Sequence, residues 1–370
     1  AAMAASKLSG ALPAISGANL TGLTSSFSEL TDTTVSTSDP ATDTNPSATG
    51  HIWVNKTSGE AYICTTATAG SNVWKNIGPG TGDVENTVTG GTITTYGSYK
   101  VHTFTSSGTL VLSANTTVDA LVVGGGGGGG DGAATGETGT GGGAGAMLTG
   151  TGLTMNAGSY TVTIGSGGAG GAGTWNTVSH GHWGTDTKLG SFIIAWGGGG
   201  GGGQSYSANS AYDNSNFAQD NYTINLGGSS SSLTWPSVGG PQGGAGGSGG
   251  GCSGAASGTK PGGEAIQPNW SIPGSLGSGT VTVYGNDGGD GVWGGGGSGG
   301  GGAGAVGATS GAGGAAGAGR ANAFKTGSNI TYATGGSGHS GSGNAGANTG
   351  SGGNNGDAAA NGIVVIRYAV

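Results

Sequence analysis

Charged residues, and arginines in particular, are scarce in this sequence. The 370 residues include 9 Lys and Arg against 17 Asp and Glu, a formal net charge of −8, and the only arginines are Arg320 and Arg367. Proteins that bind nucleic acid concentrate positive charge on one face, because the phosphate backbone supplies much of the attraction. The composition therefore excludes RGG-type RNA binding and gives no electrostatic basis for binding nucleic acid.

Cysteines and long apolar runs are scarce as well. Cys64 and Cys252 lie far apart in the sequence, and neither belongs to a CxxC or zinc-type spacing, so we expect both thiols to be unpaired. No stretch approaches the roughly 18 apolar residues that mark a membrane span. The first residues lack the basic and apolar regions of a signal peptide. Because the sequence starts at Ala1, we expect further residues to precede it.

Glycine, by contrast, is in large excess, with 95 residues of 370. Such a fraction without a collagen repeat is typical of low-complexity, disordered chains. Disordered chains are poor in aromatic and β-branched residues, whereas this chain is 33% hydrophobic and has 8 Trp and 10 Tyr. We therefore expect an ordered structure in which the glycine tracts are part of the fold.

Changes in composition along the chain predict four segments. These are a repeat-like segment (1–24), a Thr, Ser and Pro linker (25–50), a small β-module (51–80) and a glycine-rich distal domain (81–370). In the first segment, KLSGALPAISGANLTGL separates its apolar residues with Gly and Pro at neither helical nor strand spacing. An intertwined oligomer can bury these residues and a single chain cannot. The alternative is a loose apolar linker.

The β-module is predicted from a hairpin pattern. Alternation over Ile52–Asn55 and a turn at Asn55–Gly59 lead to a second strand at Glu60–Thr65. Two roles remain open for Trp53 and Trp74. They form the core of the module, which is the commoner role in so small a unit, or they form a platform for a ligand.

Strand patterns and glycine tracts alternate from about residue 92 onward. Apolar alternation predicts strands at Tyr99–Thr105, Thr109–Leu112, Val118–Val123, Ser159–Ile164, Phe192–Trp196, Thr280–Tyr284 and Ile363–Arg367. Tracts of seven glycines, Gly124–Gly130 and Gly197–Gly203, lie between them. This regular alternation favours one integrated fold.

Glycine tracts can be regular structure if they adopt the polyproline-II conformation, which has three residues per turn and no internal hydrogen bonds. Every N–H and C=O must then bond to a neighbouring segment, and only glycine lets backbones approach on all sides. Gly124–Gly130 fits a fully surrounded segment, and GAGGAAGAGRA at Gly311–Ala321 fits an edge. The predicted class is all-β: a trimeric fibre-shaft segment and a small β-module, followed by strands with packed polyglycine-II helices.

Several phrases carry a resemblance to a known family. TTVDALVVGGGGGGG, VYGNDGGDGVWGGGGSGGGGAG and the closing AANGIVVIRY resemble the glycine-rich domain at the C-terminus of tail-fibre proteins of tailed phages. The domain is also similar to the tail-tip adhesins of T-even-like phages, and the LPAI-SG and NLTGL phrases resemble fibre-shaft repeats. The resemblance implies a homotrimeric virion protein, located in an extracellular tail fibre, that contacts other tail or fibre proteins. It also implies that loops between glycine tracts bind an outer-membrane protein or glycan of the host.

The best candidates for receptor contact are aromatic, polar insertions between glycine tracts. Rings combined with Ser, Asn and Gly are typical of adaptable binding loops, because rings supply contact area at little cost in rotamer entropy. The alternative is that these rings cover gaps in a fold that has few side chains. The predicted receptor-binding residues are Trp175, His180, His182, Trp183, Tyr206, Tyr212, Phe217, Tyr222, Trp235 and Trp270.

Sites for metals, cofactors and catalysis are not predicted. His180, His182 and Asp186 could ligate a metal, but no third strong ligand of the usual kind stands near the His pair. NDGGDG at Asn286–Gly291 occurs once, without the period of calcium repeats, and predicts a turn. No GK[ST] follows a glycine loop, and neither a Ser-His-Asp arrangement nor a carboxylate pair is recognisable. We expect no enzyme activity.

Two functions remain open from the sequence. The first is a phage tail fibre that binds the host bacterial surface through loops of a rigid glycine-rich tip. The second is a purely structural fibre or filament component, in which the glycine-rich domain supplies stiffness alone. Long aromatic insertions favour the first, since a purely structural role predicts short, uniform loops.

Overall fold

The computed structural model describes residues 32–78, 87–132, 139–172, 180–203, 223–226, 229–232, 242–253, 259–267, 279–292, 294–310, 314–338 and 345–370. These residues form strands and extended segments with no α-helix among them, and hence none that could span a membrane. The predicted all-β class is confirmed. The chain divides into two compact units, within Ala1–Glu85 and within Asn86–Val370.

The first unit contains one four-stranded sheet in the order β1(Thr33–Ser36), β2(Ile52–Asn55), β3(Ala61–Thr66), β4(Val73–Gly78). The predicted hairpin is confirmed, because β2 and β3 pair antiparallel with Ile52 opposite Ile63. Strand β1 lies within the segment whose composition predicts a linker. It pairs in parallel with β2, and a contact between distant segments of this kind leaves no mark on local composition.

Aromatic rings form the small core of this sheet. Trp53 and Trp74 meet edge to face with ring centroids 5.8 Å apart, and His51 meets Trp74 in the same way at 5.9 Å. His51 also shares a hydrogen bond of 2.8 Å with the hydroxyl of Thr34 on β1. Both tryptophans are half-buried, which supports the prediction that they form the core of the module.

The second unit is built on two sheets. The first has the order β16(Thr280–Tyr284), β10(Met147–Met155), β9(Thr116–Val123), β19(Ile363–Ala369), β7(Tyr99–Phe104), β6(Thr92–Tyr96). The second has the order β13(Ile193–Ala195), β12(Thr187–Leu189), β11(Gly158–Thr163), β8(Gly108–Leu112), β5(Val88–Thr89). Two hairpins complete the described strands: β14(Thr223–Leu226) with β15(Ser229–Ser232), and β17(Arg320–Asn322) with β18(Ile330–Tyr332).

All seven strands predicted for this unit are confirmed, within one or two residues at their ends. The longest strand of the unit, β10, was not predicted, because Gly150 and Gly152 interrupt its pattern. The pairing of β10 with β9 shifts register between Gly150 and Leu153, and Gly152 has a φ of 63°. The amide of Gly152 donates to Asp119 at 3.0 Å, so the irregularity is held by a side chain of the neighbouring strand.

Alternating side chains of the first sheet supply two cores. Val118, Ala120 and Val122 of β9 face the main core between the two sheets, together with buried residues of β8, β11, β12 and β13. Leu121 and Val123 face the opposite side, where Tyr332 and its neighbours on the β17–β18 hairpin cover them. Because successive side chains of β9 point to opposite faces, its run of buried apolar residues, Ala120–Val123, reflects burial on both faces.

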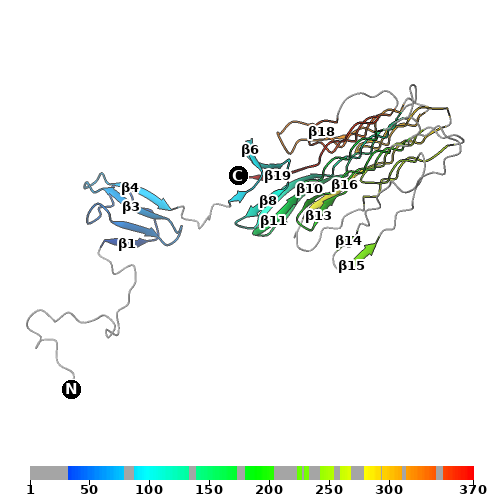
Figure 1. The fold of residues 1–370 in the computed structure, drawn as a ribbon. Helices are drawn as coiled ribbons and strands as arrows, with labels where there is room; N and C mark the ends of the chain where they lie inside the picture. The colour runs from blue at the N-terminus through cyan, green and yellow to red at the C-terminus, as the bar shows by residue number, and fades with distance from the viewer. Residues whose placement is uncertain are drawn as a thin grey trace, which may run out of the picture. The chain divides into compact units, whose positions relative to one another are not determined.

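Extended segments rich in glycine join these strands and run side by side away from the sheets, as the segments beside β10, β13, β16 and β18 show in Figure 1. We call them the glycine segments. Their residues are 124–130, 140–146, 165–171, 180–186, 197–203, 246–253, 259–267, 285–292, 295–302, 305–310, 314–319, 333–338, 350–354 and 356–362.

The backbone of Gly124–Gly130 bonds to three neighbouring segments in a repeat of three residues. The amides of Gly124, Gly127 and Gly130 donate to segment 140–146, at Ala146, Gly143 and Thr140. The amides of Gly125 and Gly128 donate to the carbonyls of Thr185 and His182. Those of Gly126 and Gly129 donate to the carbonyls of Ala360 and Asp357. All of these N···O distances are 2.8–3.0 Å.

The carbonyls of the same tract accept from three further segments. Gly125 and Gly128 accept from segment 197–203, and Gly126 and Gly129 accept from segment 165–171. Gly127 accepts from Gly353 of segment 350–354, and Gly130 accepts from Gly356. One segment therefore has six neighbours. All seven glycines are buried, and a Cβ at any of them would overlap a backbone carbonyl of a neighbour.

In a segment at the edge, one position of the three-residue repeat is exposed and carries a side chain. In the described part of the predicted edge segment, Gly314 and Gly317 are buried, whereas Ala315 and Ala318 are exposed. The alternation of glycine and alanine thus follows the three-residue repeat. Glycine stands where another backbone is close, and alanine stands where the segment faces solvent.

Candidate functional site

The glycine segments have two distinct ends. At the sheet end they continue directly into or out of β9, β10, β11, β12, β13, β16, β17, β18 and β19. We call the opposite end the far end. At the sheet end, strand pairing fixes the chain on both sides of each junction, so connections with freedom to vary in sequence and length belong at the far end.

Hydrogen bonds join the described residues at the far end to one another. Thr140 accepts from the amide of Gly130 at 3.0 Å, and its hydroxyl donates to Gly202 at 2.7 Å. Lys260 and Gly291 exchange two backbone bonds of 2.8 and 2.9 Å. Further bonds join the segment ends Gly203 and His180, Ser253 and Gly203, and Gly338 and Gly314.

These segment ends flank most of the connections that lie outside the described residues. Residues 133–138, 173–179, 254–258 and 311–313 each lie between two far-end residues. Residues 204–222 follow Gly203, and residues 339–344 follow Gly338. At least six connections therefore start from one end of the glycine segments.

Most of the predicted receptor-binding residues lie outside the described part of the chain: Trp175, Tyr206, Tyr212, Phe217, Tyr222, Trp235 and Trp270. Trp175 belongs to a connection flanked by far-end residues on both sides. Tyr206 to Tyr222 follow the far-end residue Gly203. Trp270 differs, because its described flanks lie at the sheet end: Gln267 accepts a bond of 2.7 Å from Trp196, and Gly279 directly precedes β16.

His180 and Trp183, two predicted residues that are described, face neighbouring glycine segments. The amide of Gly203 donates to Nδ1 of His180 at 2.8 Å. Trp183 donates from Nε1 to the carbonyl of Ala245 at 2.8 Å and covers Gly244, where a Cβ would lie 2.9 Å from the ring. The structure therefore gives both side chains contacts within the fold.

The three-residue repeat also separates the two histidines. His180, Trp183 and Asp186 are spaced by three. His180 and Asp186 accept from the two ends of segment 197–203, Asp186 from Gly197 at 3.1 Å, and Trp183 donates to Ala245. His182 is exposed. In the described ranges no group of three His, Cys, Asp or Glu residues could hold a metal ion. Burial lowers the pKa of His180 to about 4, so this ring is neutral at pH 7.

The NDGGDG phrase is extended structure, and the predicted turn is wrong. Asp287 accepts from the amide of Ala265 at 2.6 Å, and Asp290 accepts from that of Gly262 at 3.0 Å. Both carboxylates therefore bond to the same neighbouring segment, 259–267. Their spacing of three residues places them on one side of the segment, which the sequence alone did not indicate.

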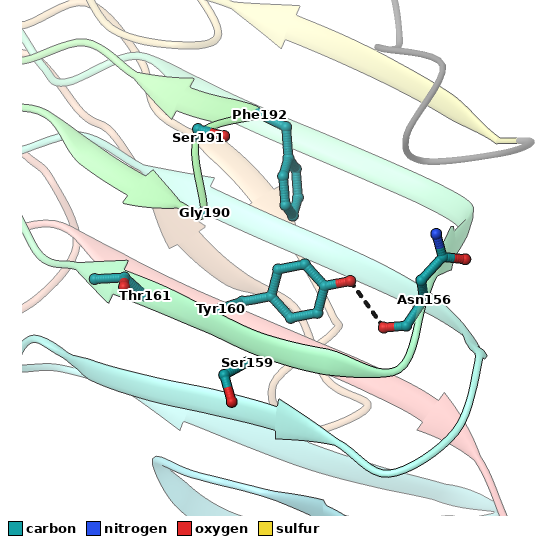
Figure 2. A pocket seen from close by; sticks show the side chains of 7 residues that line it. All are labelled: Asn156, Ser159, Tyr160, Thr161, Gly190, Ser191 and Phe192. Atoms are coloured by element: carbon teal, nitrogen blue, oxygen red, sulfur yellow. Dashed lines mark hydrogen bonds between the residues drawn. The ribbon is translucent and has the colours of Figure 1, made fainter.

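A pocket of about 560 Å³ on the second sheet was not predicted. It is lined by Asn156, Ser159, Tyr160, Thr161, Gly190, Ser191 and Phe192, as Figure 2 shows. Tyr160 and Phe192 were read only as strand residues. The signal that was missed is the pair of a ring on β11 and a ring at the β12–β13 turn, which only the sheet order brings together.

Comparison with known families assigns most of the chain. Residues 102–369 match the family described as the glycine-rich domain. This range includes β9 to β19 and every glycine segment. No curated protein matches the chain.

Proposed function

We propose that this chain, which belongs to the glycine-rich domain family, is a non-enzymatic fibre protein that binds a receptor on the bacterial surface through connections at its far end. One observation carries the proposal: at least six connections start from the same end of the glycine segments. Gathering variable connections at one end of a rigid scaffold is the usual way in which folds build binding surfaces.

The rigid scaffold is a lattice of polyglycine-II helices. Support comes from the repeat of three residues in the bonds of Gly124–Gly130 and from their six neighbouring segments. Three residues per turn is the period of this conformation, and it leaves every backbone group free to bond outward. Because each segment is held by its neighbours, the lattice positions the connections with little freedom of its own.

The composition of the connections fits recognition. Residues 204–222 contain Tyr206, Tyr212, Phe217 and Tyr222 among Ser, Asn and Ala residues. Rigid rings supply contact area, and small polar side chains adapt their hydrogen bonds to the partner. We assign receptor contact first to these four residues and to Trp175. The exposed His182 is a further candidate, whereas His180 and Trp183 act through packing.

Assignment to a homotrimeric phage tail fibre, extracellular and part of the virion, rests on the sequence resemblance. The shaft-like segment 1–24 cannot bury its apolar residues alone, which favours intertwined chains. The partners are then other fibre or tail proteins on one side and an outer-membrane protein or glycan of the host on the other.

A second candidate is a structural fibre component without a receptor. The observation that favours it is Trp183, an aromatic residue of an insertion that covers Gly244 and bonds to Ala245. If the rings of the other insertions do the same, they stabilise the lattice and leave little surface for a partner.

Binding of the full chain to susceptible bacteria tests the proposal. Replacing 206–226 with a short Gly-Ser linker is expected to abolish saturable binding to cells. The matched control replaces 268–278, whose flanks lie at the sheet end, with a linker of the same kind and is expected to keep binding. Equal binding by all three folded proteins would contradict the assignment of receptor contact to 206–226, and no binding by the unmodified chain would favour the structural role.

A further inference from the structure

We propose that the pocket lined by Tyr160 and Phe192 is a binding site for a neutral saccharide. The pocket is formed by β11, the turn before it and the turn between β12 and β13. It belongs to the sheets and contains none of the far-end residues, so this site is independent of the receptor-binding function proposed above.

Two fixed rings form the apolar part of the pocket. Tyr160 and Phe192 meet edge to face, with centroids 5.5 Å apart and planes at 85° (Figure 2). The hydroxyl of Tyr160 donates to the carbonyl of Asn156 at 2.8 Å, which holds the ring in place. Both rings also pack against the main core of the unit. An aromatic surface is therefore prepared before any ligand arrives.

Gly190 makes the arrangement of Phe192 possible. Its φ is 59°, and a Cβ at this position would meet the ring of Phe192. Its amide donates to the carbonyl of Thr161 at 2.8 Å, so the turn is tied to β11. The sequence Gly-Ser-Phe at 190–192 thus places the ring over the turn and beside Tyr160.

The polar part of the lining contains no charged residue. The polar residues of the lining are Asn156, Ser159, Thr161 and Ser191, and all four are exposed. A phosphate or an ammonium group bound there would lose hydration without an opposite charge in compensation. A neutral ligand with hydroxyl groups loses less, because amide and hydroxyl groups donate and accept in turn.

Size and shape favour a sugar among neutral ligands. Sites for small molecules have volumes of roughly 300–1,000 Å³, lined by rings with a few polar groups that fix orientation. The pocket has about 560 Å³ and this combination of groups. A sugar ring has an apolar C–H face that can lie on an aromatic ring and hydroxyl groups at its rim that can bond to the polar lining.

Saturation-transfer NMR on the full chain tests the site, with maltose, lactose and N-acetylglucosamine as probes. We expect saturation transfer from the protein to at least one of the three sugars, with a Kd on the order of 1 mM, equivalent to a binding free energy of about −4 kcal/mol. Ser191→Trp, which fills the pocket from an exposed turn, is expected to weaken binding at least tenfold. Thr95→Trp, at an exposed position of β6 in the other sheet, is the matched control and is expected to bind like the unmodified chain.

A second variant separates loss of the site from loss of the fold. Phe192→Leu keeps apolar contact with the core and removes the aromatic face, so binding is expected to fall while the melting temperature changes little. The site is overturned if no sugar is saturated, or if both pocket variants bind as the Thr95→Trp control does. The 206–226 replacement is expected to leave sugar binding intact, so failure here and failure of receptor binding can be told apart.

Discussion

Arg367 donates from Nε and Nη2 to the same carboxylate oxygen of Asp119, at 2.9 and 2.8 Å, across the pairing of β19 with β9. The guanidinium also lies between two rings, 4.4 Å from the centroid of Tyr99 and 4.1 Å from that of Phe324. One of the two arginines of the chain thus connects the first sheet to the segment before β18.

Arg367→Lys is expected to lower the free energy of unfolding by about 1–2 kcal/mol, because an ammonium group loses the planar contact with both rings and one bond to Asp119. Urea denaturation of the full chain measures the change. Arg320→Lys is the matched control: Arg320 is exposed and stacks on Tyr284 at 4.0 Å, so its replacement is expected to cost no more than about 0.5 kcal/mol. Equal effects would contradict a special role of Arg367.

Gly127→Ala is expected to destabilise the glycine-rich unit by more than about 4 kcal/mol, since its methyl group would overlap the carbonyl of Gly199. Gly346→Ala is the control, because a Cβ there makes ordinary contacts of 3.5 Å or longer. It is expected to be neutral or to stabilise by up to about 1 kcal/mol. Thermal unfolding followed by circular dichroism compares the two, and similar melting temperatures would contradict the close packing of the lattice.

Stability is expected to fall as the pH is lowered from about 6.5 toward 4. Burial lowers the pKa of His180 to about 4 and also lowers that of His102, below the ordinary value near 6.5. The unfolded chain therefore binds protons in this range that the folded chain does not, and each histidine costs up to about 1.4 kcal/mol per pH unit. Urea midpoints at pH 7.5 and 5 measure the loss.

His180→Gln supplies the comparison for the pH dependence. It removes one titrating group, so the loss of stability between pH 7.5 and 5 is expected to be smaller than in the unmodified chain. An unchanged slope would mean that His180 is protonated in the folded protein. His102 keeps part of the slope in this variant, because burial lowers the pKa of its ring and outweighs the bond of 2.7 Å that its Nδ1 donates to the carbonyl of Gly90. Its Nε2 is buried without a hydrogen-bond partner.

Neither cysteine is expected to react with Ellman's reagent in the native protein. Cys64 and Cys252 are both buried, and neither forms a disulfide, which confirms the prediction that the two thiols are unpaired. Burial raises the pKa of Cys252 to about 12, which leaves almost no thiolate at pH 8. Two thiols are expected to react after denaturation in guanidinium chloride. Rapid reaction of both thiols in the native protein would show that the lattice around Cys252 opens readily.

The sequence by itself determined the all-β class, seven strands of the second unit and the presence of ordered glycine tracts. These features rest on local patterns: the mostly apolar run Val118–Val123 reflects burial on both faces, and the mixture of Gly and Ala over 314–319 reflects the edge of the lattice. Each can be read within a window of a few residues.

Only the tertiary structure decided which segments are neighbours. The tracts Gly124–Gly130 and Gly197–Gly203 have the same letters, and a glycine backbone bonds equally well to any partner at the right distance. The opposite facing of His180 and His182, the pairing of Asp287 and Asp290 with one segment, and the meeting of Tyr160 with Phe192 all follow from those neighbours. Without side chains to specify partners locally, the strands that enter the lattice fix its arrangement.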